Sequence, residues 1–504
     1  MNAESDDLQA EIYAEASRPV PPAQAWIGGR AVEAVEGRRL ALTSPIDETS
    51  TGSIPACDRN DVDRAVAAAR GAFADRRWAG LGRRERKRVL LRFADLVTDS
   101  QRELGVLQCR DMGMPVGMAI EADAGEAAAT LRWYAEALDK LTDEMLPLTA
   151  RDSGYVVRVP LGVVGAILPW NFPLMIAAWK LGPALAAGNS VVIKPAAAAS
   201  LAICRLGALA AEAGLPDGVL NIVTGGGERV GQPLALHRDV DCITFTGSGS
   251  VGRKLLEYAG QSNLKRVSLE CGGKTANIVL EDAPNLEEAA QTAARAIFRN
   301  QGQICNAPSR LLVQRTIYQT FVGRVAEIAR SLKIGSPLDL TVDMGPIVNE
   351  GQRQLVRDAL AAAESSGIKL LVDGRRASCP RKGYYLGPSI ASAVDPQSPL
   401  AQEEVFGPVL AVIPFQTLDE AIRIANGTRY ALGAAIWTRD INKAQHAATH
   451  LVAGSIYVNA CGGVMVEMPF GGFRESGFGR DRSLHALEKY TDLKAVLVRH
   501  TPPV

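Results

Sequence analysis

The sequence predicts an α/β fold, in which helices cover both faces of sheets made largely of parallel strands. Two observations lead to this prediction. From about residue 150 onward, short and almost entirely apolar segments alternate with helix-forming segments, which is the pattern of strands buried on both faces. A second alternating block follows residue 305. Because 504 residues exceed what one compact core usually holds, two or three domains are expected.

The first half of the chain is expected to begin with a loose arm and a helical region. The first 20 or so residues, which end in RPVPPAQ, predict a loosely held arm. Residues 60–140 are predicted to be helical, because RKRVLLRFADLVTD places its apolar side chains at helical spacing. Strands are predicted at GYVVRVPLG, GVVGAILPW, SVVIKP, the middle of LPDGVLNIVTGGG, DCITFT and KRVSLE. Helices are predicted at 200–213 and after the loop FTGSGSVG.

The second half repeats the alternation and ends in a strand. The expected elements are SRLLVQR, a helix at 317–333, IKLLVDG, GPVLAVIPF, a helix at 418–426, AAIWTRD and GSIYVNA. The tail LEKYTDLKAVLVRH alternates polar and apolar residues, which predicts a strand with one solvated face. A tail strand that leaves its own domain commonly pairs with another chain.

The composition excludes several classes of function. Lys+Arg and Asp+Glu both number 55, so the chain has no general attraction for nucleic acid or for anionic membranes. No segment has the roughly 20 uninterrupted apolar residues of a membrane span, and the N-terminus has no apolar signal-peptide core. The eight cysteines form no CxxC pair and no metal-type pattern with the five histidines. We therefore expect a cytoplasmic protein with free thiols and no metal site.

Two glycine-rich loops favour a nucleotide ligand. FTGSGSVG (245–252) lies between a predicted strand and a helix, where glycines let the backbone approach a phosphate. Its spacing from Gly247 to Gly252 is not that of the usual dinucleotide fingerprint, so a tight turn without a ligand is the alternative. VTGGG (223–227) places a second such loop on the same sheet edge.

Cys305 and Glu270 are the candidate nucleophile and base. Cys305 lies in FRNQGQICNAPSR, a polar, glycine-containing neighbourhood that suits a reactive thiol better than an inert core cysteine. No histidine is nearby, so a Cys-His pair is poorly supported. Glu270, in SLECGGK, precedes two glycines that can admit a ligand; a solvated turn residue is the alternative. Cys271 is expected to pack on the opposite side of that strand.

Asn171 is the candidate donor to an oxyanion. It lies in PWNFP, among apolar residues and prolines that fix the backbone. An amide in such surroundings must be satisfied, either by capping local backbone in an Asx-type turn or by donating to a developing negative charge.

Seven ordered motifs together resemble the aldehyde dehydrogenase superfamily over essentially the whole chain. They are PWNFP, KLGPALAAGNSVVIKPA, FTGS, LECGGK, NQGQIC, EEVFGPV and PFGGFRESGFGR. RWYAEALDK and the tail GRDRSLHALEKYTDLKAV are similar to one branch, the gamma-glutamyl-gamma-aminobutyraldehyde dehydrogenases of bacterial putrescine breakdown. The resemblance implies a Rossmann-like cofactor domain (1–141 and 161–271), a second α/β catalytic domain (272–475) and oligomerisation strands (142–160 and 489–500). A homodimer or homotetramer is expected.

The resemblance also implies a role for each matching residue. Cys305 would attack the aldehyde, Asn171 and the Cys305 N–H would hold the oxyanion, Glu270 would activate water, and Lys180 would support the site. NAD would be held by Lys194, Gly225, Gly247, Ser248, Gly252, Trp170, Glu404 and Phe406. The aldehyde would be lined by Phe172, Trp179, Ile304, Asn306 and Phe470.

Three departures from the family pattern bear on cofactor and substrate. Ala197 stands where a glutamate often holds both ribose hydroxyls, so NADP should be tolerated beside NAD. Gly249 follows Ser248 where threonine is usual. In the segment 111–115, which is expected near the mouth of the aldehyde tunnel, Met114 stands where the branch often has lysine. ACGGVMVEM (460–468) is also less polar than in that branch. Asp111 and Glu467 could face a cationic or amide-bearing aldehyde; solvated surface carboxylates are the other interpretation.

The sequence therefore predicts an NAD(P)-dependent dehydrogenase that oxidises an aldehyde to the acid through a thiohemiacetal and a thioester. Its expected substrates are amino- or amide-bearing aliphatic aldehydes of polyamine breakdown. A broad-specificity aliphatic aldehyde dehydrogenase is the first alternative. A cofactor-free cysteine hydrolase and an inactive scaffold are the alternatives from other classes.

Overall fold

Eight strands of the described chain form the first sheet in the computed structural model, which describes residues 3–20, 22–149, 151–463 and 465–500. Its centre is parallel, with β9 (Leu220–Ile222), β8 (Ser190–Lys194), β7 (Val163–Ile167), β10 (Cys242–Thr246) and β11 (Arg266–Glu270) in that order. The antiparallel strands β1 (Ala25–Ile27), β2 (Arg30–Val32) and β21 (Gly477–Phe478) complete its edges.

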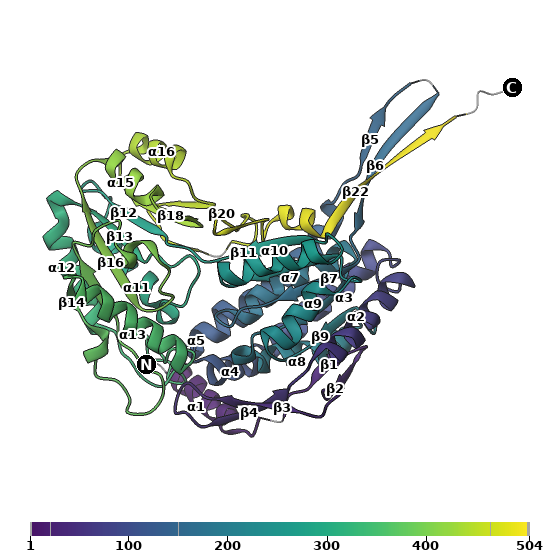
Figure 1. The fold of residues 1–504 in the computed structure, drawn as a ribbon, viewed down its shortest axis with the longest axis horizontal. Coiled ribbons are helices and arrows are strands. Elements are labelled where there is room, and N and C mark those ends of the chain that lie inside the picture. The colour runs from purple at the N-terminus through teal and green to yellow at the C-terminus, as the bar shows by residue number, and fades with distance from the viewer. Residues whose placement is uncertain (1–2, 21, 150, 464, 501–504) are drawn as a thin grey trace.

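Helices cover both faces of this sheet (Figure 1). Val191 and Ile193 of β8 pack in one cluster with α3 (Arg83–Asp99), α6 (Glu126–Ala137), α7 (Pro173–Ala187) and α8 (Leu201–Glu212). Val192, which points to the opposite face, packs in another cluster with α2 (Arg59–Ala74), α9 (Gln232–Leu236) and α10 (Gly249–Gln261). This alternation explains why the strand segments are apolar throughout.

The second sheet has the order β14, β15, β16, β13, β12, β18, β19. Their bounds are Lys369–Val372, Ser389–Ser392, Val409–Phe415, Arg310–Gln314, Ala276–Val279, Gly433–Trp437 and Ser455–Val458. One face packs against α11 (Leu286–Phe298) and α12 (Tyr318–Ser331). The other packs against α13 (Glu350–Ser365), α15 (Leu418–Asn426) and α16 (Ile441–His450). All pairs are parallel except β14 with β15.

A three-stranded antiparallel sheet extends away from both of these units (Figure 1). It contains β5 (Glu144–Pro147), β6 (Asp152–Pro160) and β22 (Thr491–Arg499), with Thr491 opposite Pro160 and Arg499 opposite Asp152. Large apolar side chains on it are exposed, Met145 to 74% and Leu497 to 62%. The assembly role of these strands, and the domain boundaries given above, stay predictions.

Shorter elements connect the layers. They are α4 (Gln101–Met112), α5 (Val116–Met118), the π-helix η1 (Ala119–Gly125), α14 (Pro399–Gln402), the hairpin β3 (Arg39–Thr43) with β4 (Ser50–Pro55), and the pair β17 (Tyr430–Ala431) with β20 (Phe473–Arg474). No helix in the described ranges is both long and apolar enough to cross a bilayer.

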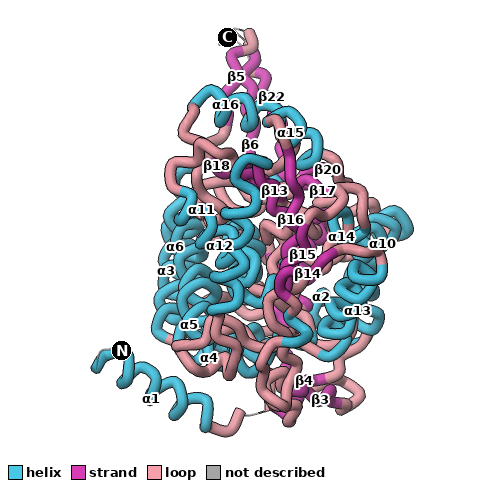
Figure 2. The backbone as a smooth tube through the Cα atoms, turned by 90° about the vertical axis from the view of Figure 1, so that its left-hand side faces the viewer, coloured by secondary structure: helices cyan, strands magenta, loops and turns pink. Residues whose placement is uncertain are grey.

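The α/β fold class is confirmed, and two details are corrected. The sheets are mixed rather than wholly parallel, because short antiparallel strands pair with edges that would otherwise be open. The loosely held N-terminal arm is wrong, since α1 (Ala3–Ser17) lies against α4 at the outside of the molecule (Figure 2). Ile12 is fully buried there, and the Gln9 side chain donates to Leu338 O over 2.8 Å. The sequence of α1 has no clear apolar stripe, so neither the helix nor its packing was predicted.

Candidate active site

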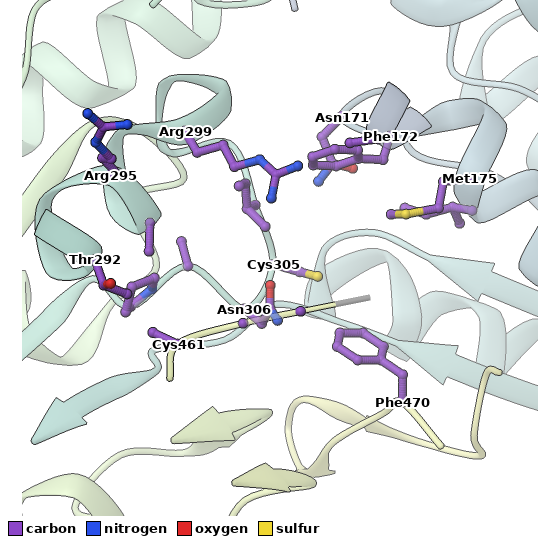
Figure 3. Close-up of a pocket in the computed structure, with 18 of the residues that line it drawn as sticks. Asn171, Phe172, Met175, Thr292, Arg295, Arg299, Cys305, Asn306, Cys461 and Phe470 are labelled. Carbon is purple, nitrogen blue, oxygen red and sulfur yellow. The ribbon is translucent and has the colours of Figure 1, made fainter. Parts of the chain in front are cut away.

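A cavity of about 390 Å³ lies between the two large units, and Cys305, Glu270 and Asn171 all line it. Figure 3 shows Cys305 pointing into this space, with Asn171 and Phe172 on one side and Phe470 on another. Cys305 follows α11 of the second unit, whereas Glu270 ends β11 and Asn171 precedes α7 in the first. Three distant segments therefore converge on one cavity.

The loop before Cys305 has an unusual backbone. Asn300, Gln301 and Gly302 all have positive φ, at 47°, 56° and 72°. A Cβ on Gly302 would lie 2.1 Å from Gly407 O, so close backbone approach requires glycine. Gln303 fixes the turn: its Nε2 donates to Asn300 O over 3.1 Å, and its Oε1 accepts from Val348 N at 3.0 Å. The polar residues thus hold the thiol in place, and strain of this kind gathers at functional sites.

The Cys305 thiol is stable as the protonated form in this state. Burial is the main cause, and the nearby carboxylates of Glu270 and Glu404 add to it, so its pKa lies well above the usual thiol value. Hydrogen bonds from the backbone N–H groups of Asn306 and Cys305 act in the opposite direction. A thiolate formed here would have those two donors as partners.

Both the side-chain amide and the backbone carbonyl of Asn171 are hydrogen-bonded. Its Nδ2 donates to Gln303 O over 3.0 Å, and Asn300 Nδ2 donates to Asn171 O over 3.0 Å. Asp123 of η1 fixes the start of α7 by accepting from Met175 N at 2.9 Å and Leu174 N at 3.3 Å. One amide hydrogen of Asn171 engages Gln303, so the other can reach an oxyanion in the cavity.

Glu270 has the features of a general base. It is 4% exposed, and its Oε1 has no hydrogen-bond partner among the described residues. Burial, with a further contribution from Asp481, raises the pKa of Glu270 to about 8. The glycines that follow it serve the protein itself: a Cβ on Gly272 would lie 1.9 Å from Glu404 Oε2, and one on Gly273 would lie 2.6 Å from Cys305 O. Close packing within the protein therefore explains these two glycines, in place of the ligand approach that the sequence predicted.

Lys180 does not touch the cavity but belongs to a buried charge cluster. Its Nζ and that of Lys489 both donate to the carboxylate of Asp481, and Lys180 and Asp481 are 1% and 2% exposed. Burial opposes ionisation of Asp481, yet the two lysines keep its pKa below the usual value. Asp481 and Lys489 were not predicted from the sequence, because Lys180 and Asp481 are 301 residues apart and no local pattern joins them.

Several residues predicted to bind a dinucleotide lie at or just beyond the carboxyl ends of parallel strands. Lys194 ends β8 and Ser248 caps α10 by accepting from Val251 N. Gly247 is needed for close packing, since a Cβ there would lie 2.5 Å from the Phe245 ring. Gly225 (φ 134°) follows β9, and Gly252 is buried against Cys271 Sγ, as expected for that cysteine. Such a sheet edge with a helix N-terminus suits a pyrophosphate.

Two observations support a cofactor at this edge. Lys194 is 8% exposed, its Nζ has no hydrogen-bond partner among the described residues, and burial lowers its pKa to about 8. A buried amine of this kind is ready for a hydroxyl or a phosphate. Glu404 accepts from Gly273 N at 3.0 Å with one oxygen only, and Phe406 stacks edge-on with Trp170 at 5.3 Å between ring centroids. The Lys194 ammonium group and the second carboxylate oxygen of Glu404 therefore have no hydrogen-bond partner among the described residues and are available to a cofactor.

The five residues predicted to contact the aldehyde all line the cavity; they are Phe172, Trp179, Ile304, Asn306 and Phe470. Sequence reasoning missed Met175, Cys461, Arg295, Arg299 and Arg482, which line it too. Met114 is not at a tunnel mouth, because it is fully buried in the core of the first unit. Asp111 faces neither aldehyde nor solvent: it is 3% exposed and accepts from Leu201 N at 3.0 Å. Glu467 is exposed, in agreement with the solvated interpretation.

No group of three or more histidine, cysteine or acidic residues that could hold a metal ion occurs in the described part of the chain. The groups that line the cavity include a thiol, a carboxylate of raised pKa and an amide donor. These groups can form and hydrolyse a covalent adduct on sulfur.

Comparison with known proteins gives one consistent answer. The model of the aldehyde dehydrogenase family matches residues 32–496. The NADP/NAD-dependent aldehyde dehydrogenase PuuC of Escherichia coli K12 is 44% identical over 473 residues, which cover 94% of this chain and 95% of the relative. The aminoacetaldehyde dehydrogenase of Pseudomonas aeruginosa is 41% identical over 493 residues, covering 97% and 99%. The crystal structure of a gamma-glutamyl-gamma-aminobutyraldehyde dehydrogenase from Burkholderia cenocepacia is 47% identical, with a TM-score of 0.95 and coverage of 97% and 99%.

Proposed function

Because the chain belongs to the aldehyde dehydrogenase family and is an NAD(P)-dependent aldehyde dehydrogenase, we propose that its reaction proceeds through a covalent adduct on Cys305. The observation that carries the proposal is the convergence of Cys305, Glu270 and Asn171 on one cavity. The rival interpretations, a cofactor-free cysteine hydrolase and an inactive scaffold, do not agree with membership of this family.

In the first half-reaction, the sulfur of Cys305 bonds to the aldehyde carbon and the carbonyl oxygen becomes negatively charged. The backbone N–H of Cys305 and the second amide hydrogen of Asn171 hold that oxygen. Because the thiol has a raised pKa, a carboxylate in the same cavity must take its proton, and Glu270 is placed to do so. The adduct is a thiohemiacetal.

The dinucleotide would be held by Lys194, the loops at Gly225 and Gly247, the start of α10, and Glu404. When bound, NAD(P)+ supplies the hydride acceptor that the oxidation requires. The protein's part is to keep the cysteine adduct fixed, through the Asn300–Gln303 turn, while the adduct becomes a thioester.

Before the second half-reaction, Glu270 releases the thiol proton to solvent. The ionised Glu270 then removes a proton from water, and the resulting hydroxide attacks the thioester. The carbon–sulfur bond breaks, the acid leaves and the thiol of Cys305 regains a proton. A thiolate is a good leaving group, so a carboxylate base suffices without any histidine. The raised pKa of Glu270 makes it a stronger base than an exposed glutamate.

The Cys305→Ala variant tests this assignment. It should bind the cofactor, as measured by fluorescence titration, and fail to form reduced cofactor from propanal. Retained turnover would overturn the role of Cys305. The unmodified protein should reduce NAD+ in the same assay, and a lack of reduction across an aldehyde panel would overturn the proposed activity itself.

We propose amino- or amide-bearing aliphatic aldehydes as the preferred substrates, with simple aliphatic aldehydes accepted. The names of the similar proteins support this class, since one is an aminoacetaldehyde dehydrogenase and another a gamma-glutamyl-gamma-aminobutyraldehyde dehydrogenase. Broad use of unsubstituted aliphatic aldehydes is the alternative, and the apolar walls at Phe172, Trp179 and Phe470 support it. A steady-state panel of matched aldehydes separates the two.

We also propose that NAD is used with NADP tolerated. Ala197 cannot repel a 2′-phosphate as a carboxylate would, and the similar PuuC is NADP/NAD-dependent. A kcat/KM ratio for NAD over NADP above about a thousand would contradict relaxed choice.

An oligomeric state built on β5, β6 and β22 is a further proposal. Its support is the exposed apolar surface there, including Met145, Leu493 and Leu497. A Leu493→Asp, Leu497→Asp variant should then sediment as a smaller species than the unmodified protein. A cytoplasmic location is inferred from the eight cysteines, all of which are free thiols.

A further inference from the structure

Residues 473–478 join the two large units of the protein. β20 pairs with β17, which directly precedes β18 of the second sheet, whereas β21 pairs with β11 of the first sheet. Figure 1 shows β20 beside β11 and α10, where the two units meet. Glu475 and Ser476 lie between β20 and β21, so they are placed at the boundary of the units.

Ser476 is the fixed point of this segment. It is fully buried, and its Oγ donates to Gly272 O over 2.8 Å and accepts from Ala431 N at 2.9 Å. One hydroxyl is therefore bonded to both units. The backbone O of Ser476 also accepts from Cys271 N at 2.9 Å. The segment thus has an anchor that does not depend on charge.

Glu475 connects the units by exposed charges instead. Its Oε2 accepts from Arg253 Nη2 at 2.6 Å and lies 3.3 Å from Arg429 Nε. Arg429 also pairs with Glu403, and its guanidinium carbon lies 5.0 Å from the Tyr430 ring centroid. Arg253 belongs to α10 of the first unit, whereas Arg429 and Glu403 belong to the second. Four alternating charges therefore form a chain from one unit to the other.

This chain of charges borders the predicted cofactor site. Arg253 lies one turn after Gly249 on α10, and its side chain turns back toward the start of the helix. A Cβ on Gly249 would lie 3.8 Å from Arg253 Nη1 and 3.9 Å from Glu475 O. At the other end of the chain, Glu403 is the neighbour of Glu404. The two ends therefore lie beside the residues predicted to hold the pyrophosphate and a ribose.

The exposure of these four side chains decides what their ion pairs can do. Each side chain is between 43% and 59% exposed. Exposed ion pairs are screened by water and salt and contribute little to stability. They can therefore break and re-form while Ser476 holds the segment in place.

We propose that Arg253, Glu475, Arg429 and Glu403 form a charge latch across the edge of the cofactor site, which is closed while a dinucleotide is bound and open while it enters or leaves. The inference rests on the proposed function, because it requires a dinucleotide at this edge. A ligand held both at the start of α10 and at Glu404 contacts both units, so its release requires them to separate there. The latch therefore controls the rate of cofactor exchange, a step that limits turnover in many enzymes, rather than the chemical steps on Cys305.

The rate of NADH release tests the latch directly. Glu475→Gln removes the charge that two ion pairs share, so release of NADH should be about two- to fivefold faster. Stopped-flow fluorescence after mixing with excess NAD+ measures this rate, and Arg429→Gln should change it in the same direction. Glu287→Gln is the matched control, because Glu287 pairs with Arg324 at 2.8 Å with similar exposure, but on α11 and α12 within the second unit. That variant should release NADH at the rate of the unmodified protein.

Salt and a double variant show whether the effect belongs to the ion pairs. Sodium chloride screens exposed charges, so the ratio of the Glu475→Gln rate to the unmodified rate should fall toward one as the salt concentration rises to about 1 M. The Arg253→Gln, Glu475→Gln double variant should release NADH no faster than Glu475→Gln alone, because the pair with Arg253 is already lost. Additive effects of the two substitutions would contradict the latch, and so would an unchanged rate in Glu475→Gln.

The alternative role for Arg253 is direct binding of the pyrophosphate. In that case Glu475→Gln frees the guanidinium for the cofactor and slows NADH release, a result that would overturn the latch. In the cofactor-free protein, hydrogen–deuterium exchange of residues 473–478 should be faster in Glu475→Gln than in Glu287→Gln, and equal exchange would also overturn it. Failure of the unmodified protein to bind NADH would instead overturn the proposed function, and the inference would fall with it.

Discussion

Two buried carboxylates in this protein, Glu270 and Asp481, have opposite surroundings. Asp481 accepts from Lys180 and Lys489, and those lysines keep its pKa low in spite of burial. Glu270 has one oxygen without a described partner, and burial together with the charge of Asp481 raises its pKa to about 8. The comparison shows that cation contact, rather than depth of burial, decides which carboxylate is a fixed charge and which can exchange a proton.

Replacing Glu270 should have the largest effect on activity. Glu270→Gln keeps the shape but removes the base, so steady-state turnover should fall about 10²- to 10⁴-fold. If Glu270 acts mainly on the thioester, a rapid-mixing experiment will show a burst of reduced cofactor followed by slow turnover. Loss of the burst as well would assign the thiol proton to Glu270. Turnover within tenfold of the unmodified enzyme would contradict a role as base.

Replacing Asp481 should have the largest effect on stability. Asp481→Asn leaves Lys180 and Lys489 buried without a counter-charge, so the free energy of unfolding should fall by about 3 kcal/mol. Chemical denaturation monitored by fluorescence measures this. Asp492→Asn is the matched control, because its partner Arg266 lies 2.9 Å away on an exposed surface, where solvent screens the pair, so this variant should lose much less stability. Equal losses in the two variants would contradict the buried cluster's importance.

The pH dependence of activity sharpens the same contrast. With a pKa near 8, Glu270 is mostly protonated at neutral pH, so turnover limited by thioester hydrolysis should rise with pH and level off above about pH 8. The titration belongs to Glu270 and Cys305 jointly, since their charges interact. Removing the charge of Asp481 favours ionised Glu270, so Asp481→Asn should move the rising limb to lower pH. A limb that stays in place would show that Asp481 does not act on Glu270.

These contrasts mark what could be predicted from the sequence. The α/β fold class followed from alternating segments, because apolar runs report burial directly, and the family followed from seven ordered motifs. Cys305, Glu270 and Asn171 were each proposed from local chemistry, and the structure brings them to one cavity. Their roles stay predictions. Local sequence was informative at these three positions, because each residue lies among neighbours that are unusual for its type of side chain.

The remainder depends on contacts between distant segments. Lys180 meets Asp481 across 301 residues, and Trp179 meets Phe470 and Arg482, which belong to a distant segment of the chain. The placement of Asp111 and Met114 near an entrance was wrong for the same reason. Their local sequence contains a helix end and a proline, but their burial comes from distant residues: Leu201 at the start of α8 donates to Asp111, and Met114 packs in the core cluster of the first unit.

The smallest expected effect concerns a third type of buried carboxylate, which has backbone partners only. Asp123 accepts from two N–H groups at the start of α7, and burial nevertheless raises its pKa to about 7. Asp123→Asn should lower the free energy of unfolding by about 1 kcal/mol, as for loss of a helix cap. It should also lower turnover, because α7 begins directly after Asn171 and Phe172.

Asp111→Asn is the matched control for that variant. Asp111 caps α8 in the same way, with a pKa also raised to about 7 by burial, but α8 contributes no residue to the cavity lining whereas α7 does. Both substitutions should cost similar stability in chemical denaturation, and only Asp123→Asn should change kcat with propanal. Equal kinetic effects would mean that the α7 cap does not position Asn171. Unequal kinetic effects would show that Asp123 differs from both Asp481 and Glu270. It would be neither a fixed ion nor a base, but a helix cap that orients the oxyanion donor.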